Sequence, residues 1–212
     1  MGKYRVDDGF YGLLIAIKNK HLDIVQYLIE NGADIMNNCT TNRHIYPELH
    51  YAVINHDIKM IKYLTSPYFL SLSEKHKNII NVTDINNATP IHVCCTSIRQ
   101  NNKLEILKYL IEIRIDINGQ DCYGNTALHI VSRQIHDNIE IIKCLINNGI
   151  NINIQNKEGN TALHLVANSN FEKIKYLIDN GADINIKNNN GNTILQCVPP
   201  KFKIIHSYLL QL

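Results

Sequence analysis

A short motif recurs along nearly the whole chain and constrains its fold more than any other feature. Residues 124–129 read G-N-T-A-L-H, and residues 159–164 repeat those letters. A second motif, N-G-x-x-I-N, follows each copy at 148–153 and 180–185. Anchored on the central Leu or its equivalent, six copies are separated by 36, 42, 37, 35 and 32 residues and centre on Leu13, Leu49, Ile91, Leu128, Leu163 and Leu195. Such a period predicts stacked supersecondary units rather than one globular core.

Further copies of both motifs point to a known family. Residues 89–92 read T-P-I-H, and residues 31–35 read N-G-A-D-I. Together with the copies above, they resemble the T-P-L-H and G-A-D-(I/V)-N signatures of ankyrin repeats. The resemblance implies an all-α ankyrin-repeat solenoid of about six stacked helix pairs with projecting turns, formed by residues 1–212 as a single domain. The abundance of Asn, Ile and Lys is typical of an AT-rich genome, so the chain also resembles the stand-alone multi-ankyrin proteins of large DNA viruses.

Two stretches depart from the regular repeat. Ser66-Pro67 ends a helix early, and the residues through Asn78 replace the usual Gly-Ala-Asp link. We interpret this insertion as a surface loop, with a recognition element as the alternative. Pro199-Pro200 interrupts the sixth copy, because proline cannot continue a helix interior. The last repeat is therefore predicted to be a shortened cap whose final helix runs from about residue 203 to residue 210.

Composition excludes several classes of protein. Lys and Arg number 21 against 19 for Asp and Glu, without a basic run, so a nucleic-acid partner is not expected. No signal peptide or long apolar span is apparent, so no membrane association is expected, and the chain is predicted to be intracellular, cytoplasmic or nuclear, in the host cell if viral. The six cysteines lack C-x-x-C spacing, so free thiols are predicted. A monomer without cofactors is expected.

Two columns of side chains have competing interpretations. One consists of His50, His92, His129 and His164. A metal site is conceivable, but successive copies would lie about a helix-pair thickness apart, roughly 10 Å, which exceeds the span of a zinc site. A structural role at each helix start is therefore predicted. The other column is Tyr27, Tyr63, Tyr109 and Tyr176, for which packing between repeats is favoured over an aromatic recognition ladder.

The resemblance implies a non-catalytic module that binds an unidentified protein partner on its concave face. An adaptor that recruits a partner to a degradation or signalling complex is the alternative. Such adaptors usually carry an additional C-terminal recruitment box, whereas this chain ends at Leu212, directly after the predicted cap. No nucleophile, base and orienting group recur at a catalytic spacing, and no P-loop, G-x-G-x-x-G or H-E-x-x-H motif is present, so an enzyme is not predicted.

The partner-binding residues are predicted by position. Motif residues and the apolar stripe are committed to folding, which leaves the turn tips and the exposed face of each first helix free to vary. These positions are Ile85, Asn86, Thr96, Cys122, Tyr123, Asn125, Arg133, Lys157, Glu158, Asn160, Asn168, Asn189, Asn190 and Asn192. Tyr123 and Arg133 are the first candidates for hot spots, because Tyr and Arg are enriched among residues that dominate interface energy.

Three asparagines match a position that is often hydroxylated in ankyrin proteins. Asn118, Asn153 and Asn185 each lie eight residues after a Leu of a second helix. Met36 takes that place in the first repeat and cannot be modified in this way. The resemblance therefore implies possible hydroxylation at these three asparagines, in a host that has the enzyme.

Overall fold

The computed structural model describes residues 7–33, 47–72, 79–96, 102–135, 138–168 and 171–211, with the side chains of 7–11 and 168 outside that description. These residues form helices and turns without a β-strand, which confirms the predicted all-α class. They divide into two compact units, Met1–Ile115 and Asp116–Leu212. That residues 1–212 form one domain stays a prediction. Among the described helices, none has the length and apolar character needed to cross a membrane.

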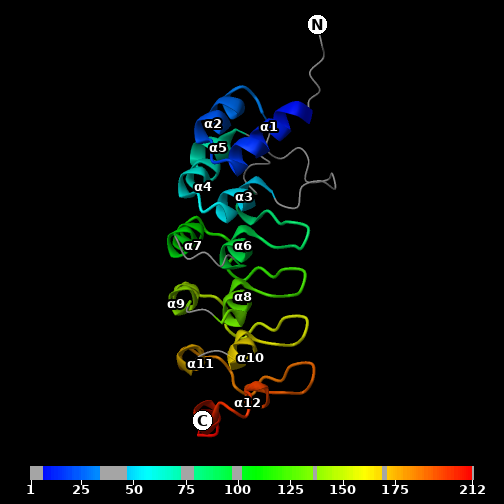
Figure 1. Cartoon of the computed structure of the whole chain (residues 1–212), viewed down its shortest axis with the longest axis vertical. Coiled ribbons are helices and arrows are strands. Elements are labelled where there is room, and N and C mark those ends of the chain that lie inside the picture. The colour runs from blue at the N-terminus through cyan, green and yellow to red at the C-terminus, as the bar shows by residue number, and fades with distance from the viewer. Residues whose placement is uncertain are drawn as a thin grey trace. The chain divides into compact units, whose positions relative to one another are not determined.

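The first unit contains three helix pairs (Figure 1). They are α1 (Asp7–Lys18) with α2 (Leu22–Glu30), α3 (Glu48–Ile54) with α4 (Ile58–Leu64), and α6 (Pro90–Thr96) with α7 (Lys103–Glu112). The first helices pack in sequence, α1 against α3 and α3 against α6. Their anchors Leu13, Leu49 and Ile91 are fully buried, so the repeated Leu position forms the core between neighbouring pairs. In α2 the buried side chains are Val25 and Ile29, whereas 44% of the Ile24 surface is exposed.

The insertion after α4 is more ordered than a surface loop. Its first residues form helix α5 (Pro67–Ser71), and the Ser66 hydroxyl accepts a hydrogen bond from the Phe69 amide at 3.2 Å. Phe69 is fully buried and lies 6.0 Å from the Tyr63 ring, centroid to centroid. The loop interpretation is therefore wrong for this part, because burial of an aromatic ring fixes it to the core. Residues 73–78 lie outside the described residues.

The second unit contains the other three pairs, in which first and second helices form separate columns (Figure 1). They are α8 (Ala127–Arg133) with α9 (Ile139–Asn147), α10 (Ala162–Leu165) with α11 (Phe171–Asp179), and α12 (Ile194–Cys197) with α13 (Lys203–Leu209). A 3-10 turn at Val166–Asn168 continues α10. The four-residue α12 and the bounds of α13 agree with the predicted shortened last repeat.

The anchor position shows which helix faces are covered. Leu128 and Leu163 are each 1% exposed, because the next first helix packs over them. Leu195, at the same place in α12, is only half-buried, since no further repeat follows within these residues. Its neighbour Ile194 remains 1% exposed. The difference predicts that the anchor contributes stability mainly through contacts with the following repeat.

Two histidines of the second unit, His129 and His164, link their repeats to the next one. The amide and the hydroxyl of Thr126 lie 3.2 and 2.9 Å from Nδ1 of His129, and Nε2 of that ring lies 3.0 Å from the carbonyl oxygen of Asn160. Because the Thr126 amide can only donate, Nδ1 accepts and Nε2 carries the proton. His164 makes the same contacts, with the Asn192 carbonyl at 3.1 Å. The predicted local role is correct but incomplete, since each ring also bonds the turn of the following repeat.

Burial lowers the pKa of both His129 and His164, although hydrogen bonds to the following turn oppose the change. Acidification from neutral to about pH 5 is therefore expected to lower the melting temperature. In the unfolded chain both rings return to the ordinary pKa of 6.5. Below that value the unfolded chain binds more protons than the folded chain, so the free energy of unfolding falls as the pH falls. Thermal melting at a series of pH values measures this dependence.

The chain supplies a matched control for the titration of these rings. In α12 the corresponding residue is Gln196, whose Oε1 accepts from the Thr193 amide at 2.8 Å. The double variant His129→Gln and His164→Gln should keep both helix caps and show a shallower loss of stability on acidification. An unchanged pH dependence would show that other groups cause the loss.

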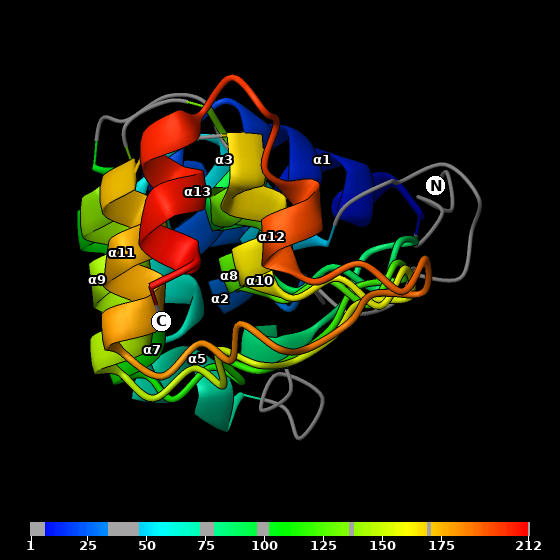
Figure 2. The same ribbon diagram turned by 90° about the horizontal axis from the view of Figure 1, so that it is seen from below.

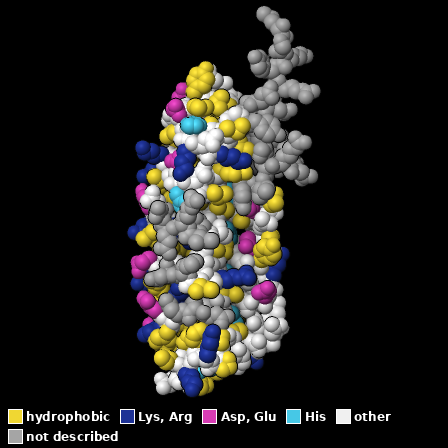
Figure 3. Space-filling model, in the orientation of Figure 1, with side chains coloured by type: hydrophobic (Ala, Val, Ile, Leu, Met, Phe, Trp, Pro, Cys, Tyr) yellow, Lys and Arg dark blue, Asp and Glu magenta, His cyan; other side chains and the backbone are white. Residues whose placement is uncertain are grey.

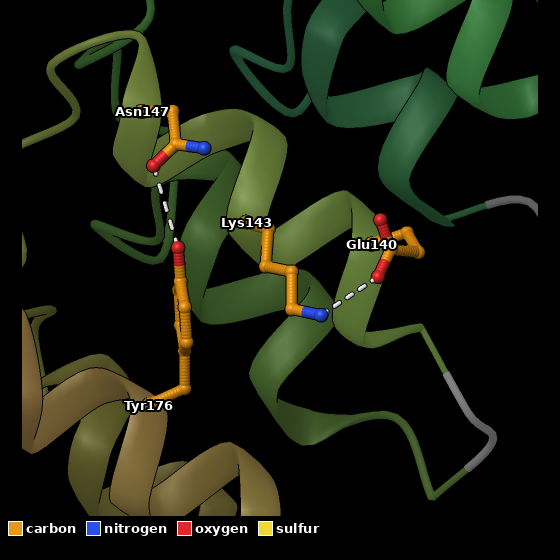
Figure 4. A network of polar contacts seen from close by, with 4 residues as sticks. All are labelled: Glu140, Lys143, Asn147 and Tyr176. Atoms are coloured by element: carbon orange, nitrogen blue, oxygen red, sulfur yellow. Dashed lines mark hydrogen bonds and ion pairs between the residues drawn. The ribbon is translucent and has the colours of Figure 1, made fainter.

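Two of the four recurring tyrosines, Tyr109 and Tyr176, contact the preceding helix pair. The Tyr176 hydroxyl donates to Oδ1 of Asn147 at 3.3 Å, and the Lys143 ammonium lies 6.0 Å from the Tyr176 ring centre and 2.8 Å from Glu140 (Figure 4). In the first unit, the Tyr109 hydroxyl lies 2.8 Å from the Thr65 hydroxyl. These contacts agree with packing between repeats. Tyr63 instead lies against Phe69 of the insertion, and 65% of the Tyr27 surface is exposed.

Candidate functional site

The turns before the first helices are built around one side-chain oxygen each. In the second unit, Oδ1 of Asp121 accepts from the amides of Tyr123 and Asn125, at 2.9 and 2.8 Å. Asn156 and Asn188 make the same pair of bonds to the residues two and four positions ahead. Such Asx turns fix the loop tip locally. The tips extend to one side of the helices (Figures 1 and 2).

Neighbouring turns are joined by backbone and side-chain hydrogen bonds. The Lys157 amide donates to the Tyr123 carbonyl at 3.0 Å, and the Asn189 amide donates to the Glu158 carbonyl at 3.0 Å. Asparagine side chains add a second link: Nδ2 of Asn156 donates to Oδ1 of Asn125 at 2.8 Å. The pair Asn188 and Asn160 repeats this link at 2.9 Å. The turns of the second unit therefore hold one another in register.

A cavity of about 340 Å³ opens between these turns and the first helices of the second unit. Its lining residues are Tyr123, Asn125, Arg133, Asn156, Lys157, Glu158 and Leu165. Arg133 is the last residue of α8 and Leu165 the last of α10, so helix ends form one wall and turn tips the other. The Tyr123 ring is 64% exposed. The cavity thus has an accessible aromatic side chain, an apolar patch and three charged groups.

Five of the predicted partner-binding residues line this cavity: Tyr123, Asn125, Arg133, Lys157 and Glu158. Cys122, Asn160, Asn189, Asn190 and Asn192 belong to the same three turns but do not line it. In the first unit, Ile85 and Asn86 lie in the turn before α6, and Thr96 ends that helix. The side chain of Asn168 lies outside the described residues.

Two features of the site were not predicted from the sequence. Asn156 and Leu165 were not among the predicted residues, although Asn156 corresponds to Asp121 in the repeat and is therefore recognisable as a turn-forming residue. Asn125 and Asn160 were predicted to be free to vary, whereas their side chains accept hydrogen bonds from the next turn. These two residues therefore support the turns as well as forming part of the predicted surface.

Reactive groups are not gathered into a second site among the described residues. There, no group of three or more His, Cys, Asp or Glu side chains has the arrangement of a metal site. Cys94, Cys95, Cys122, Cys144 and Cys197 are free thiols, and Cys39 lies outside the described residues. Burial raises the pKa of Cys197. A raised pKa disfavours the nucleophilic thiolate, so this residue resembles a packed thiol rather than a reactive one.

Charge on the visible surface is mixed. Figure 3 shows described Lys and Arg side chains interspersed with acidic and hydrophobic ones on one face. That pattern differs from the basic stripe typical of nucleic-acid-binding proteins.

Comparisons with known proteins agree with the helix-pair architecture. A family model described as ankyrin repeats (3 copies) matches residues 49–156 and 132–198, and one described as ankyrin repeats (many copies) matches residues 13–65. Among curated proteins, the chain is similar to the nuclear factor NF-kappa-B p105 subunit of Gallus gallus, with 31% identity over 126 residues, which cover 58% of this chain and 11% of that protein. It is also similar to the NAD-dependent deacetylase sir2B of Dictyostelium discoideum, with 28% identity over 130 residues, 52% of this chain and 16% of that protein. The chain thus matches only a small part of either relative.

Proposed function

The chain belongs to the ankyrin repeat family, and from this premise we propose that it is a non-catalytic module that holds a protein partner against its turn tips and first helices. Ankyrin repeats generally mediate protein–protein interactions. The partner is proposed to contact the concave face at the turn tips and first helices of the second unit, and Ile85, Asn86 and Thr96 are the proposed contact residues of the first unit.

The cavity at Tyr123 and Arg133 is the observation that carries this proposal. Its residues come from two successive repeats, and its walls are fixed by the hydrogen bonds between their turns. A wall that is already ordered loses little conformational entropy on binding, which favours affinity. The exposed Tyr123 ring supplies apolar area at low entropic cost, as Tyr does at many interfaces.

Substituting Tyr123 and Arg133 together by Ala is expected to weaken partner binding by at least about 2 kcal/mol, roughly thirtyfold. Melting should be nearly unchanged, because both side chains are exposed. Affinity purification with mass spectrometry from the native cell would identify the partner, and calorimetric titration of that partner would measure the loss.

Ile204 and Lys203 in α13 offer a matched control, since both are exposed and lie outside the cavity. Their double substitution by Ala should leave binding unchanged. If binding survives the change at Tyr123 and Arg133 but is lost on replacing residues 73–78, the insertion is the recognition element. Restricting that replacement to 73–78 leaves the buried Phe69 in place.

The same proposal covers the cellular location, the oligomeric state, the class of ligand and the origin of the protein. We propose an intracellular protein, cytoplasmic or nuclear, that acts as a monomer on a protein partner without nucleic acid, membrane or cofactor. The mixed surface charge supports the lack of a nucleic-acid partner. Origin in a large DNA virus with an AT-rich genome, acting in a host cell, is supported by the abundance of Asn, Ile and Lys.

Hydroxylation at Asn118, Asn153 and Asn185 is also proposed, with different hydrogen bonding of the side chain at the three positions. Oδ1 of Asn118 accepts from the Asn151 amide at 2.8 Å, and Oδ1 of Asn153 accepts from the Asp183 amide at 2.9 Å. Asn185 is exposed, and its side chain makes no hydrogen bond to the described residues. Co-expression with an asparaginyl hydroxylase should therefore modify Asn185 first. Peptide mass analysis that finds no added oxygen at any of the three would refute the proposal.

A further inference from the structure

The ionic groups around the second unit's cavity do not balance one another. Arg133 and Lys157 are both exposed and form no ion pair with the described residues. The one carboxylate of the lining, Glu158, accepts a hydrogen bond from Nδ2 of Asn160 at 3.0 Å. The lining therefore holds two cationic groups against one carboxylate, and neither cation is paired with that carboxylate.

The neutral polar groups of the lining are largely occupied. Oδ1 of Asn156 accepts two turn amides, and its Nδ2 donates to Asn125. The hydrogen-bond donors left to meet a ligand are the Arg133 guanidinium, the Lys157 ammonium and the Tyr123 phenol, beside the half-buried side chain of Leu165. Two of these three donors are cations, against the single carboxylate of Glu158.

From this charge complementarity we propose that the cavity binds a carboxylate side chain from an extended, acidic segment of the partner protein, flanked by an apolar residue. The proposal rests on the proposed function and adds the chemistry of the ligand. Arg133 donates to the carboxylate through its planar fork, Lys157 adds a second positive charge, and the flanking residue lies on Tyr123 and Leu165. A volume near the lower end of ligand pockets suits one or two side chains rather than a folded element.

A selection of randomised short peptides displayed on phage against the full chain tests this chemistry. The pool bound by the unsubstituted chain should be enriched in Asp and Glu relative to the naive library. Selection on the double variant Arg133→Glu and Lys157→Glu should lose that enrichment. An individual acidic peptide should bind this variant at least about tenfold more weakly, because charge-assisted hydrogen bonds are lost and like charges are introduced.

The double variant Lys187→Glu and Lys203→Glu is the matched control. Both lysines are exposed, lie in the second unit and form no ion pair with the described residues, so net charge changes equally outside the cavity. This variant should select the same acidic pool as the unsubstituted chain. Absence of acidic enrichment on the unsubstituted chain, or its persistence on the Arg133 and Lys157 variant, would overturn the proposal.

Resynthesis of one selected peptide distinguishes carboxylate from phosphate. Replacing its acidic residue by Gln or Asn should abolish binding, whereas a phosphoserine version that binds more than about tenfold tighter would identify phosphate as the ligand and overturn the carboxylate proposal. If the selected peptides show no acidic bias but fail to bind the Tyr123→Ala variant, the acidic ligand is refuted and the proposed function is not. The proposed function fails separately, if the native partner still binds after Tyr123 and Arg133 are both replaced by Ala.

Discussion

Replacing Gly159 by Ala is expected to lower the free energy of unfolding by about 2–4 kcal/mol, through backbone strain and a clash with the next repeat. Gly159 has φ +74°, a conformation that side chains with a Cβ disfavour. A Cβ at this position would lie 2.6 Å from the backbone nitrogen of Asn189. That nitrogen donates the hydrogen bond to Glu158 that joins the two turns, so relief of the clash breaks the link.

Gly191 provides a control that separates the two causes. It occupies the same place in the following turn at φ +77°, but a Cβ there meets no atom within 4 Å. Replacing Gly191 by Ala should therefore lower the free energy of unfolding only through backbone strain, by about 1 kcal/mol. Chemical denaturation measures both losses, and amide exchange at Asn189 should accelerate in the Gly159 variant alone. Equal losses for the two variants would mean that the contact between turns contributes nothing.

The fold could be predicted because each repeat contains the residues that specify its own local structure. Thr126 and Thr161 begin first helices, Gly159 allows the turn, and Leu128 and Leu163 are buried between pairs. Local conformation and burial pattern agree at these positions, and the agreement is repeated along the chain. The predicted end of the last first helix before Pro199-Pro200 followed from the same local rules.

Contacts between repeats were less predictable than conformations within them. Lys173 is fully buried in α11, and its ammonium donates to the Gln134 carbonyl at 3.0 Å, across 39 residues of chain. A lysine in the first turn of a helix would be assigned to solvent from its type. The side-chain hydrogen bonds that Asn156 and Asn188 donate to the preceding turn could not be predicted either, because an Asn at a turn is already explained by the turn itself.

The candidate site was predicted as a set of positions, and its local geometry came from the structure. The sequence predicted Tyr123, Arg133 and Lys157 because none of them has an evident role in folding. That criterion applies to each residue separately. Their convergence on one cavity depends on how the end of α8 faces the turn before α10. The surplus of positive charge likewise depends on which charged residues meet at the cavity, two cations and one carboxylate, which composition does not show.

Truncating Leu163 to Ala is expected to lower the free energy of unfolding by about 2–5 kcal/mol, which is the second large effect. Leu163 is 1% exposed, and α10 packs between the neighbouring first helices α8 and α12. The lost methyl groups therefore leave a buried cavity that the surrounding side chains cannot readily fill. Denaturant unfolding of the full chain measures the loss. The m-value should stay constant if the folded and unfolded states keep their surface areas.

The same truncation at Leu195 is the matched comparison, because this residue occupies the identical motif position but is only half-buried. Its loss should cost about 1 kcal/mol or less, since fewer contacts disappear and solvent fills the space. A cost at Leu195 equal to that at Leu163 would show that the anchor acts within its own helix pair. The opposite ranking would require a further segment to cover Leu195, because a half-exposed side chain has too few neighbours to account for it.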